Sequence, residues 1–157
     1  MNPVLEGLAE KFEEVSWGES HGQVVARVPA EAWQPFAAAA RDFGFEMCVD
    51  ITAVDWLRAR PRRFEVVANL VSVSQRLRLR MITDVDGETP LLSSLTSVWP
   101  GANFAEREVY DMFGITFEGH PDLTRILMPD EWEGHPLRKD FDTGSVPVQF
   151  KAAPKVT

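Results

Sequence analysis

Apolar residues along this chain recur with two periods, which predict a mixture of helices and strands. Three segments have an apolar residue every three or four positions, as on one face of an amphipathic helix; these are residues 3–14, 30–43 and 90–98. Four others alternate apolar and polar residues or are rich in branched side chains, as β-strands are; these are residues 23–28, 45–56, 64–71 and 76–81. Pro35, inside the second helix, costs a hydrogen bond unless it falls in the first turn.

The last two strands predict an antiparallel hairpin, because the connection between them is short and polar. The second of these strands has Leu77, Leu79 and Met81 on one face and arginines on the other. An order of helix, strand, helix and three strands, followed by further helices, predicts an α+β fold. We expect two layers, with a small mixed or mostly antiparallel sheet, helices on one face of it, and an extended C-terminal segment.

A short helix, predicted from residue 104 to residue 113, is crowded with charged side chains. Asn103 is a good N-cap, and Glu106 three residues later completes a capping box. Gly114 stands where a left-handed residue ends a helix. The predicted buried stripe is Ala105, Val109, Met112 and Phe113. The other side carries Glu106, Arg107, Tyr110 and Asp111, with Arg107 and Asp111 spaced as an i,i+4 ion pair.

After this helix the sequence becomes irregular, and Glu-Gly-His-Pro occurs twice, at 118–121 and 133–136. Such a segment cannot bury much by itself, so it must lie on the sheet of its own chain or on another protein. We therefore divide the single domain into a self-contained α+β body, a helix with a docking segment, and a tail; these are residues 1–100, 101–142 and 143–157. The tail lacks periodicity and is expected to be disordered or to be an arm that docks.

Length and composition are those of an ordinary soluble domain. The 157 residues can form one core, and no run of eighteen apolar residues could span a bilayer. The N-terminus is acidic and lacks the pattern of a secretory or transit peptide, so a cytoplasmic location is expected. Cys48 is the one cysteine, which excludes an intrachain disulfide and a four-cysteine metal site, and its apolar neighbours predict a buried structural thiol.

The charge is unevenly distributed along the chain. A net charge of −8 argues against nucleic-acid binding, which needs a basic surface. Residues 57–80, however, carry seven arginines and one glutamate. This stretch could meet an acidic partner surface or could be a solvated strand face at the edge of the sheet, and the sequence leaves both possibilities open.

The acids and histidines of residues 102–142 suggest two kinds of active site. Glu106 and Glu108 lie about 200° apart on a helix, so they do not form a facing acid–base pair. The ligand chemistry for zinc is present in His120, His135, Asp122 and Asp140. Fifteen residues separate the two histidines, however, and neither a His-x-x-x-His pair nor a common nucleotide or hydrolase glycine motif occurs. A stand-alone metalloenzyme is therefore the weaker hypothesis.

The same residues closely resemble the signature of a known family. They read EREVYDMFGI at 106–115, GHPDL at 119–123, RIL at 125–127 and GHPLRKDF at 134–141, with Phe117 among them. This pattern resembles the 30-kilodalton subunit of respiratory complex I, which in bacteria is the C subunit of NADH–quinone oxidoreductase. The resemblance is dense over residues 102–142 and looser over residues 30–100. Two residues depart from the family pattern: Thr124, where a second basic residue is common, and Asp142, where a proline is common.

The resemblance implies a cofactor-free subunit in the quinone module of the hydrophilic arm, peripheral on the cytoplasmic side of the bacterial inner membrane. It implies contact with the 49-kilodalton subunit and the small iron–sulfur subunit of complex I, whereas the iron–sulfur clusters and FMN belong to partner subunits. The complex transfers electrons from NADH to quinone and couples this to proton translocation. Homologous subunits of membrane-bound hydrogenases and of ferredoxin- or deazaflavin-linked complexes are the alternative within the family.

On this interpretation the charged residues of 102–142 belong to an interface and are not catalysts. We expect no catalytic, cofactor-binding or metal-binding residue in the chain, no nucleic-acid partner, and membrane association only through the complex. The residues expected to contact a partner or to fix the segment are Glu106, Arg107, Glu108, Tyr110, Asp111, His120, Asp122, Arg125, His135, Arg138 and Asp140. Charge-assisted hydrogen bonds that are desolvated at such an interface stabilise it by about 1.5–3 kcal/mol each.

Overall fold

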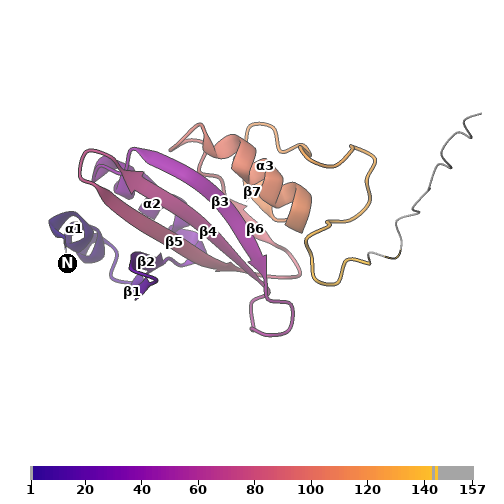
Figure 1. Ribbon diagram of the computed structural model, residues 1–157, viewed down its shortest axis with the longest axis horizontal. Coiled ribbons are helices and arrows are strands. Elements are labelled where there is room, and N and C mark those ends of the chain that lie inside the picture. The colour runs from indigo at the N-terminus through magenta and orange to yellow at the C-terminus, as the bar shows by residue number, and fades with distance from the viewer. Residues whose placement is uncertain (1, 143, 145–157) are drawn as a thin grey trace, which may run out of the picture.

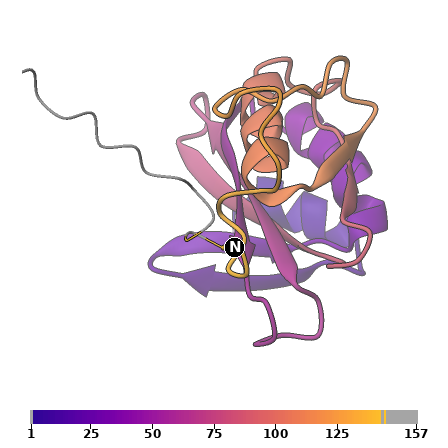
Figure 2. The ribbon, with the colours of Figure 1, turned by 90° about the vertical axis from the view of Figure 1, so that its right-hand side faces the viewer.

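The structure is a computed structural model and describes residues 2–142 and 144. In chain order its elements are α1 (Pro3–Lys11), β1 (Ser16–Ser20), β2 (Gln23–Arg27), the 3₁₀ helix η1 (Ala30–Ala32), α2 (Trp33–Asp42), β3 (Met47–Asp55), β4 (Phe64–Ser72), β5 (Leu77–Val85), β6 (Leu91–Ser93), α3 (Ala102–Phe113) and β7 (Thr116–Glu118). The helices lie on one side of a twisted sheet, as Figures 1 and 2 show from two directions.

The main sheet has five strands in the order β1-β2-β5-β4-β3. The pairs β1–β2, β5–β4 and β4–β3 are antiparallel, whereas β2 and β5 run parallel. A second, two-stranded parallel sheet joins β6 to β7. The predicted α+β fold with a mixed sheet and helices on one face is therefore confirmed, and so is the predicted hairpin, which is formed by β4 and β5.

The core lies between the sheet and the helices. Every second residue of β4 faces the helices and is fully buried; these residues are Phe64, Val66, Ala68 and Leu70. Trp33 and Phe36 of α2 and Phe113 of α3 belong to the same core, as do Ile115 and Phe117 beyond α3. The expectation that residues 1–100 form a body that needs little from the rest is thus corrected, because α3 and β7 supply part of its core.

Residues 90–98 do not form the helix that the sequence predicts. Leu91–Ser93 form β6, in which Leu92 is buried and Leu91 is exposed, so the local period is two. The strand is aligned by tertiary bonds: Thr116 N–H donates to the Pro90 carbonyl, and Ser94 N–H donates to that of Glu118. A three-residue strand depends on its partner, and this partner lies more than twenty residues further along the chain.

Other boundaries differ by a few residues from the prediction. The first helix ends at Lys11, and the second is divided into η1 and α2. Pro35 falls in the first turn of α2, where its missing N–H costs nothing. The predictions omit β1 and β7. The sequence of β1 is Ser-Trp-Gly-Glu-Ser, in which glycine and glutamate disfavour strands, and β7 is only three residues long.

Two further features concern membrane-spanning helices and the one cysteine, Cys48. Within the described residues, no helix has the length and apolar character needed to cross a bilayer. Cys48 is half-buried on β3, and burial raises the pKa of its thiol to about 12, so the thiol is protonated at neutral pH. The predicted tail lies outside the described residues apart from Gly144.

Candidate functional site

The two ends of helix α3 are capped differently. Its N-terminal residue is Ala102, preceded by Gly101, and no side chain caps it, so the predicted capping box of Asn103 and Glu106 is wrong. The backbone carbonyl of Asn103 instead accepts a hydrogen bond from Nε2 of His120 at 3.1 Å. At the other end Gly114 has φ 74° and a left-handed conformation, which confirms the predicted C-terminal glycine.

Glu106 points into the core and is fully buried, although the sequence places it on a polar side. One carboxylate oxygen accepts from the Leu95 amide at 2.6 Å and the other from the Ser94 hydroxyl at 2.6 Å. Burial raises the pKa of Glu106 to about 7, and these two hydrogen bonds oppose that shift only in part. Glu106 therefore fixes the chain between β6 and α3.

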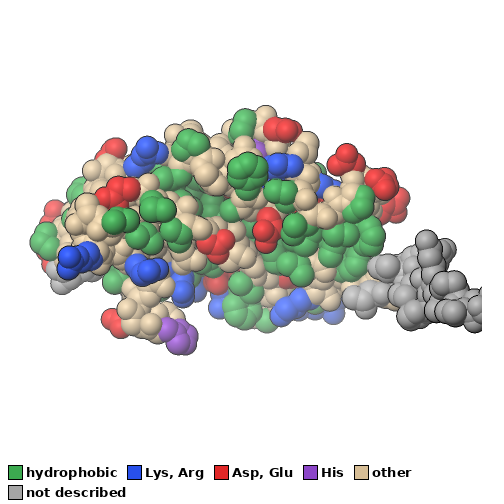
Figure 3. All heavy atoms as spheres, turned by 45° about the horizontal axis from the view of Figure 1, so that its top comes forward, with side chains coloured by type: hydrophobic (Ala, Val, Ile, Leu, Met, Phe, Trp, Pro, Cys, Tyr) green, Lys and Arg blue, Asp and Glu red, His purple; other side chains and the backbone are tan. Residues whose placement is uncertain are grey.

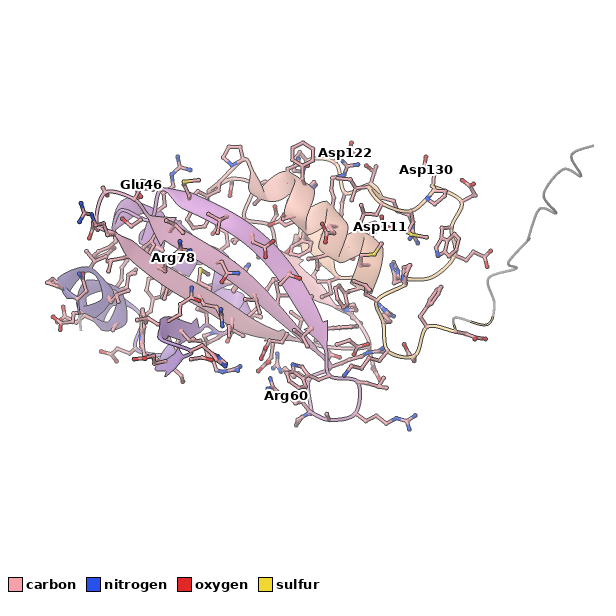
Figure 4. All side chains as sticks on the ribbon, in the orientation of Figure 1. Glu46, Arg60, Arg78, Asp111, Asp122 and Asp130 are labelled. Atoms are coloured by element: carbon pink, nitrogen blue, oxygen red, sulfur yellow. The ribbon has the colours of Figure 1, made fainter. Side chains whose placement is uncertain are left out.

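Asp111 is the hub of the following segment and is also fully buried. One oxygen forms an ion pair with Arg125 at 2.8 Å, and the other accepts the three successive backbone amides of Ile126, Leu127 and Met128, at 3.1, 2.7 and 2.9 Å. Burial alone would raise the pKa of Asp111, but these bonds to its ionised form hold the pKa below the ordinary value. Figure 4 shows Asp111 on the side of α3 that faces the loop carrying Asp130.

Arg107 does not form the predicted i,i+4 pair with Asp111. Its guanidinium donates to the carbonyl oxygens of Thr124 at 3.0 Å and Arg125 at 2.9 Å. The reason is that Asp111 turns inward, to where Arg125 and three amides satisfy it. Arg107 and Asp111 thus bind neighbouring parts of the same irregular segment from two positions on α3.

The second Gly-His-Pro turn packs against the C-terminal end of α3. Nδ1 of His135 donates to the Asp111 carbonyl at 3.0 Å, and the Arg138 guanidinium donates to the Phe113 carbonyl. Burial lowers the pKa of His135, which favours the neutral ring. A β-carbon on Gly114 would lie 2.6 Å from the His135 ring and 2.7 Å from Arg138, so the segment needs a glycine there.

Two residues that the sequence analysis overlooked connect this segment to the sheet. Asp55 is the last residue of β3, is buried, and accepts the Lys139 amide at 2.8 Å. Arg63 binds both Asp55 at 2.8 Å and Asp140 at 2.6 Å. The period-two pattern of β3 places Asp55 on the same face as Ile51 and Ala53, and a carboxylate at a core position was the signal that could have revealed it.

The eleven predicted site residues divide into two groups. Eight have side chains that form hydrogen bonds or ion pairs within the chain: Glu106, Arg107, Asp111, His120, Arg125, His135, Arg138 and Asp140. Glu108 and Asp122 have exposed side chains, and Tyr110 is half-buried with its ring in edge contact with His135 at 6.1 Å. The structure thus brings most of them together around α3, and their contact with a partner stays a prediction.

The arrangement does not assemble the catalytic groups considered above. His120 binds the carbonyl of Asn103 and His135 that of Asp111, which are about 12 Å apart along a helix. Among residues 2–142, no three His, Cys, Asp or Glu side chains lie close enough to hold a metal ion. Glu106 is buried and Glu108 is exposed, so these two carboxylates do not face each other.

Comparison with known proteins identifies the family. The family model described as "Respiratory-chain NADH dehydrogenase, 30 Kd subunit" matches residues 26–146, which is most of the chain. The chain belongs to this 30 Kd subunit family. The match contains α3 and the whole segment that Asp111, Arg107 and Asp55 hold in place.

Relatives in the 30 Kd subunit family include three proteins that are each named as the C subunit of NADH-quinone oxidoreductase. The protein of Salinispora tropica is 53% identical over 69% of this chain and 44% of its own length. That of Roseiflexus sp. is 52% identical over 68% and 60%, and that of Bordetella avium is 40% identical over 88% and 76%. The chain therefore spans less than half the length of some of the curated relatives that it matches.

Two solved structures are similar to this 30 Kd subunit family member. A trypsin-resistant fragment of Nqo5 matches with a TM-score of 0.70 and 37% identity, over 76% of this chain and 99% of the fragment. A chain of the archaeal membrane-bound sulfane sulfur reductase matches with a TM-score of 0.79 over 98% of this chain and 96% of its own. Its identity is 24%, so that likeness concerns the fold alone.

Proposed function

We propose that the chain is a structural subunit of NADH–quinone oxidoreductase and docks on its neighbours through α3 and residues 115–142. The complex transfers electrons from NADH to quinone and couples this to proton translocation. The observation that carries the proposal is the family match over residues 26–146, together with relatives that are named as the C subunit of this enzyme. The chain contributes no catalytic residue of its own.

The geometry of the segment supports a docking role. Asp111, Arg107 and Asp55 fix residues 124–139 by bonds to backbone groups, so this irregular chain is held in one conformation before any partner arrives. Fixing a loop in advance lowers the entropy that binding would otherwise cost. We infer that the segment is a preformed surface.

That surface carries exposed apolar side chains. Phe104 is 63% exposed, Leu127 60%, Leu137 54% and Ile126 39%. Figure 3, in which the top of Figure 1 comes forward, shows hydrophobic patches on this face with acidic side chains beside them. Apolar groups gathered on a rigid surface and bordered by polar residues are typical of a protein–protein interface.

The partners that we propose are the 49-kilodalton subunit and the small iron–sulfur subunit of the complex. Iron–sulfur clusters and FMN would belong to partner subunits, since this chain has one cysteine and its two signature histidines each bind a backbone carbonyl. The chain would be peripheral, on the cytoplasmic side of the inner membrane, and attached through the complex.

Charge insertion at the apolar surface tests the docking role. Leu127→Asp and Phe104→Asp should each lower, by at least about tenfold, the amount of the 49-kilodalton and small iron–sulfur subunits recovered with a tagged chain. The reason is that docking would bury an unpaired carboxylate. Val73→Asp is the matched control, since Val73 is 64% exposed in the turn between β4 and β5. Equal recovery with all three variants would contradict docking through this surface.

A further inference from the structure

The face of the sheet away from the helices is uncovered in the described part of the chain (Figures 1 and 2). Alternate residues of β4 and β5 point to it, and the register sets Val67 beside Ile82, Asn69 beside Arg80 and Val71 beside Arg78. Figure 4 shows Arg78 on the sheet and Arg60 on the loop between β3 and β4. This surface, the open face, is separate from α3 and its segment.

A cavity of about 650 Å³ opens on this face. It lies between β1 and Trp56, and Val25 and Ile82 are both nearly buried on its lining. Two arginines, Arg27 and Arg80, and two glutamates, Glu19 and Glu65, also line it. The apolar base suits an apolar side chain, and because Arg27 is bonded to Glu65, the guanidinium group of Arg80 is the one placed to meet a carboxylate beside that side chain.

The open face carries the arginines Arg27, Arg60, Arg78 and Arg80 and the carboxylates of Asp50, Glu65 and Asp84, so arginines slightly outnumber acids on it. Glu65 is buried there and accepts hydrogen bonds from both Arg27 and Arg60, so its negative charge is shared by two arginines. Arg80 donates to the neutral amide oxygens of Gln23 at 2.8 Å and Asn69 at 3.4 Å, which leave its charge without compensation. Arg78 is exposed on the same face. In the strand register Asp50 lies beside Asn69, in the same row as Arg80, and Asp84 lies beside Glu65. The chain as a whole has a net charge of −8.

An open sheet edge borders the cavity. In the described sheet β1 pairs with β2 alone, and Ser16, Gly18 and Ser20 line the cavity. A β-carbon on Gly18 would meet nothing within 4 Å. An extended segment that paired with β1 would point every second side chain over this cavity, as peptides do when they add a strand to a sheet.

We propose that the open face is a docking surface for an acidic, extended segment of a partner protein. Carboxylates of that segment pair with Arg78, Arg80 and the exposed part of Arg27, and an apolar side chain enters the cavity over Val25 and Ile82. The proposal goes beyond the proposed function and does not depend on it, because it concerns the opposite side of the molecule from α3 and uses a different partner chemistry.

The test uses the full 157-residue chain and a fluorescein-labelled peptide of alternating Glu and Val, followed by fluorescence anisotropy. Saturable binding that weakens with added salt is expected. Arg80→Glu and Arg78→Glu should each weaken binding by about tenfold or more, since each replaces an attraction by a repulsion. Arg41→Glu, the same change on α2 at the helical side, should alter it by less than about twofold. Circular dichroism melts check that all variants fold.

Two further peptides, a lipid vesicle and a second copy of the chain complete the set of ligands to be tested. A Glu–Ser peptide should bind more weakly than the Glu–Val peptide, because it has no side chain for the apolar base, and a Lys–Val peptide should not bind. The proposal is overturned if the acidic peptide fails to saturate, or if Arg41→Glu weakens it as much as Arg80→Glu. It is also overturned if no peptide binds and the chain instead binds phosphatidylserine vesicles. The same holds if no peptide binds and the chain instead forms a dimer in analytical sedimentation.

Discussion

The carboxylate of Asp111 and the guanidinium of Arg125 meet at 2.8 Å, with side chains that are 0% and 14% exposed. The same carboxylate gathers the amides of the next three residues, so one side chain of α3 determines the path of an irregular segment fifteen residues away. Buried carboxylates with this many donors rigidify their surroundings when every donor is satisfied.

Asp111→Ala should lower the free energy of unfolding by about 3–5 kcal/mol, because it leaves Arg125 and three amides in a shielded site without an acceptor. Urea denaturation at neutral pH measures the change. Asp122→Ala, which removes an exposed carboxylate of the same segment, should stay within about 0.5 kcal/mol of the original chain. Similar losses for both variants would mean that Asp111 has no special role.

Glu106 should make the chain less stable as the pH rises from about 4.5 to about 7. Its pKa is near 4.5 in the unfolded chain and about 7 in the folded one, so the folded state binds the extra proton within this window. The stabilisation is complete below pH 4.5 and is lost as the pH passes 7, with a total of about 3 kcal/mol.

Glu106→Gln isolates this effect, because glutamine has no proton to lose and can still accept the Leu95 amide. The difference in unfolding free energy between the original chain and this variant should change by about 2.5 kcal/mol between pH 5 and pH 8. Other groups titrate in both proteins and cancel in the difference. A difference that is constant with pH would show that the pKa of Glu106 is not raised.

Gly114→Ala should destabilise the chain by at least about 1–2 kcal/mol, since alanine disfavours the left-handed conformation. Its β-carbon would also collide with His135 and Arg138. Gly18→Ala is the matched control. The φ of Gly18 lies outside the left-handed region and a β-carbon there would have no neighbour within 4 Å, so alanine in β1 should be neutral or stabilising. Thermal melts of the two variants should therefore differ in direction or clearly in size.

Asp55 should matter more than Asp140, although both bind Arg63. Burial would raise the pKa of Asp55, but bonds from Arg63, Lys139 and Leu57 lower it to about 2. Asp55→Ala should cost about 3–5 kcal/mol, because it leaves Arg63 and two amides without their buried acceptor. Asp140 has a side chain that is 54% exposed, so Asp140→Ala should cost less than about 1 kcal/mol. Urea titrations of both variants decide the order.

Local signals in the sequence were sufficient for much of the fold. The alternation in β4 and β5 and the glycine that ends α3 depend on neighbours within a few residues, and both predictions are confirmed. Glu106 and Asp111 were placed on a polar side because charged residues usually face water. Their partners lie 11 to 17 residues away, and only the folded chain brings those partners close enough to make burial favourable.

The short sheet of β6 and β7 illustrates the same limit. Leu91–Ser93 follow a proline and precede Leu95, which resembles the start of a helix, yet pairing with Thr116–Glu118 outweighs that local preference. Asp55 could have been found, because its position in the alternation of β3 sets a carboxylate among apolar residues. Its partner Lys139 could not, since 84 positions separate the two in the chain.

The central claim is that this chain is a subunit of NADH–quinone oxidoreductase. The most direct measurement is to purify a tagged chain from detergent-solubilised membranes of cells that express it, identify the proteins that accompany it, and assay electron transfer. The account predicts that the 49-kilodalton and small iron–sulfur subunits accompany it and that the purified material oxidises NADH with quinone as acceptor. Recovery of the chain alone, or with a complex that uses hydrogen or ferredoxin and does not oxidise NADH, would contradict it.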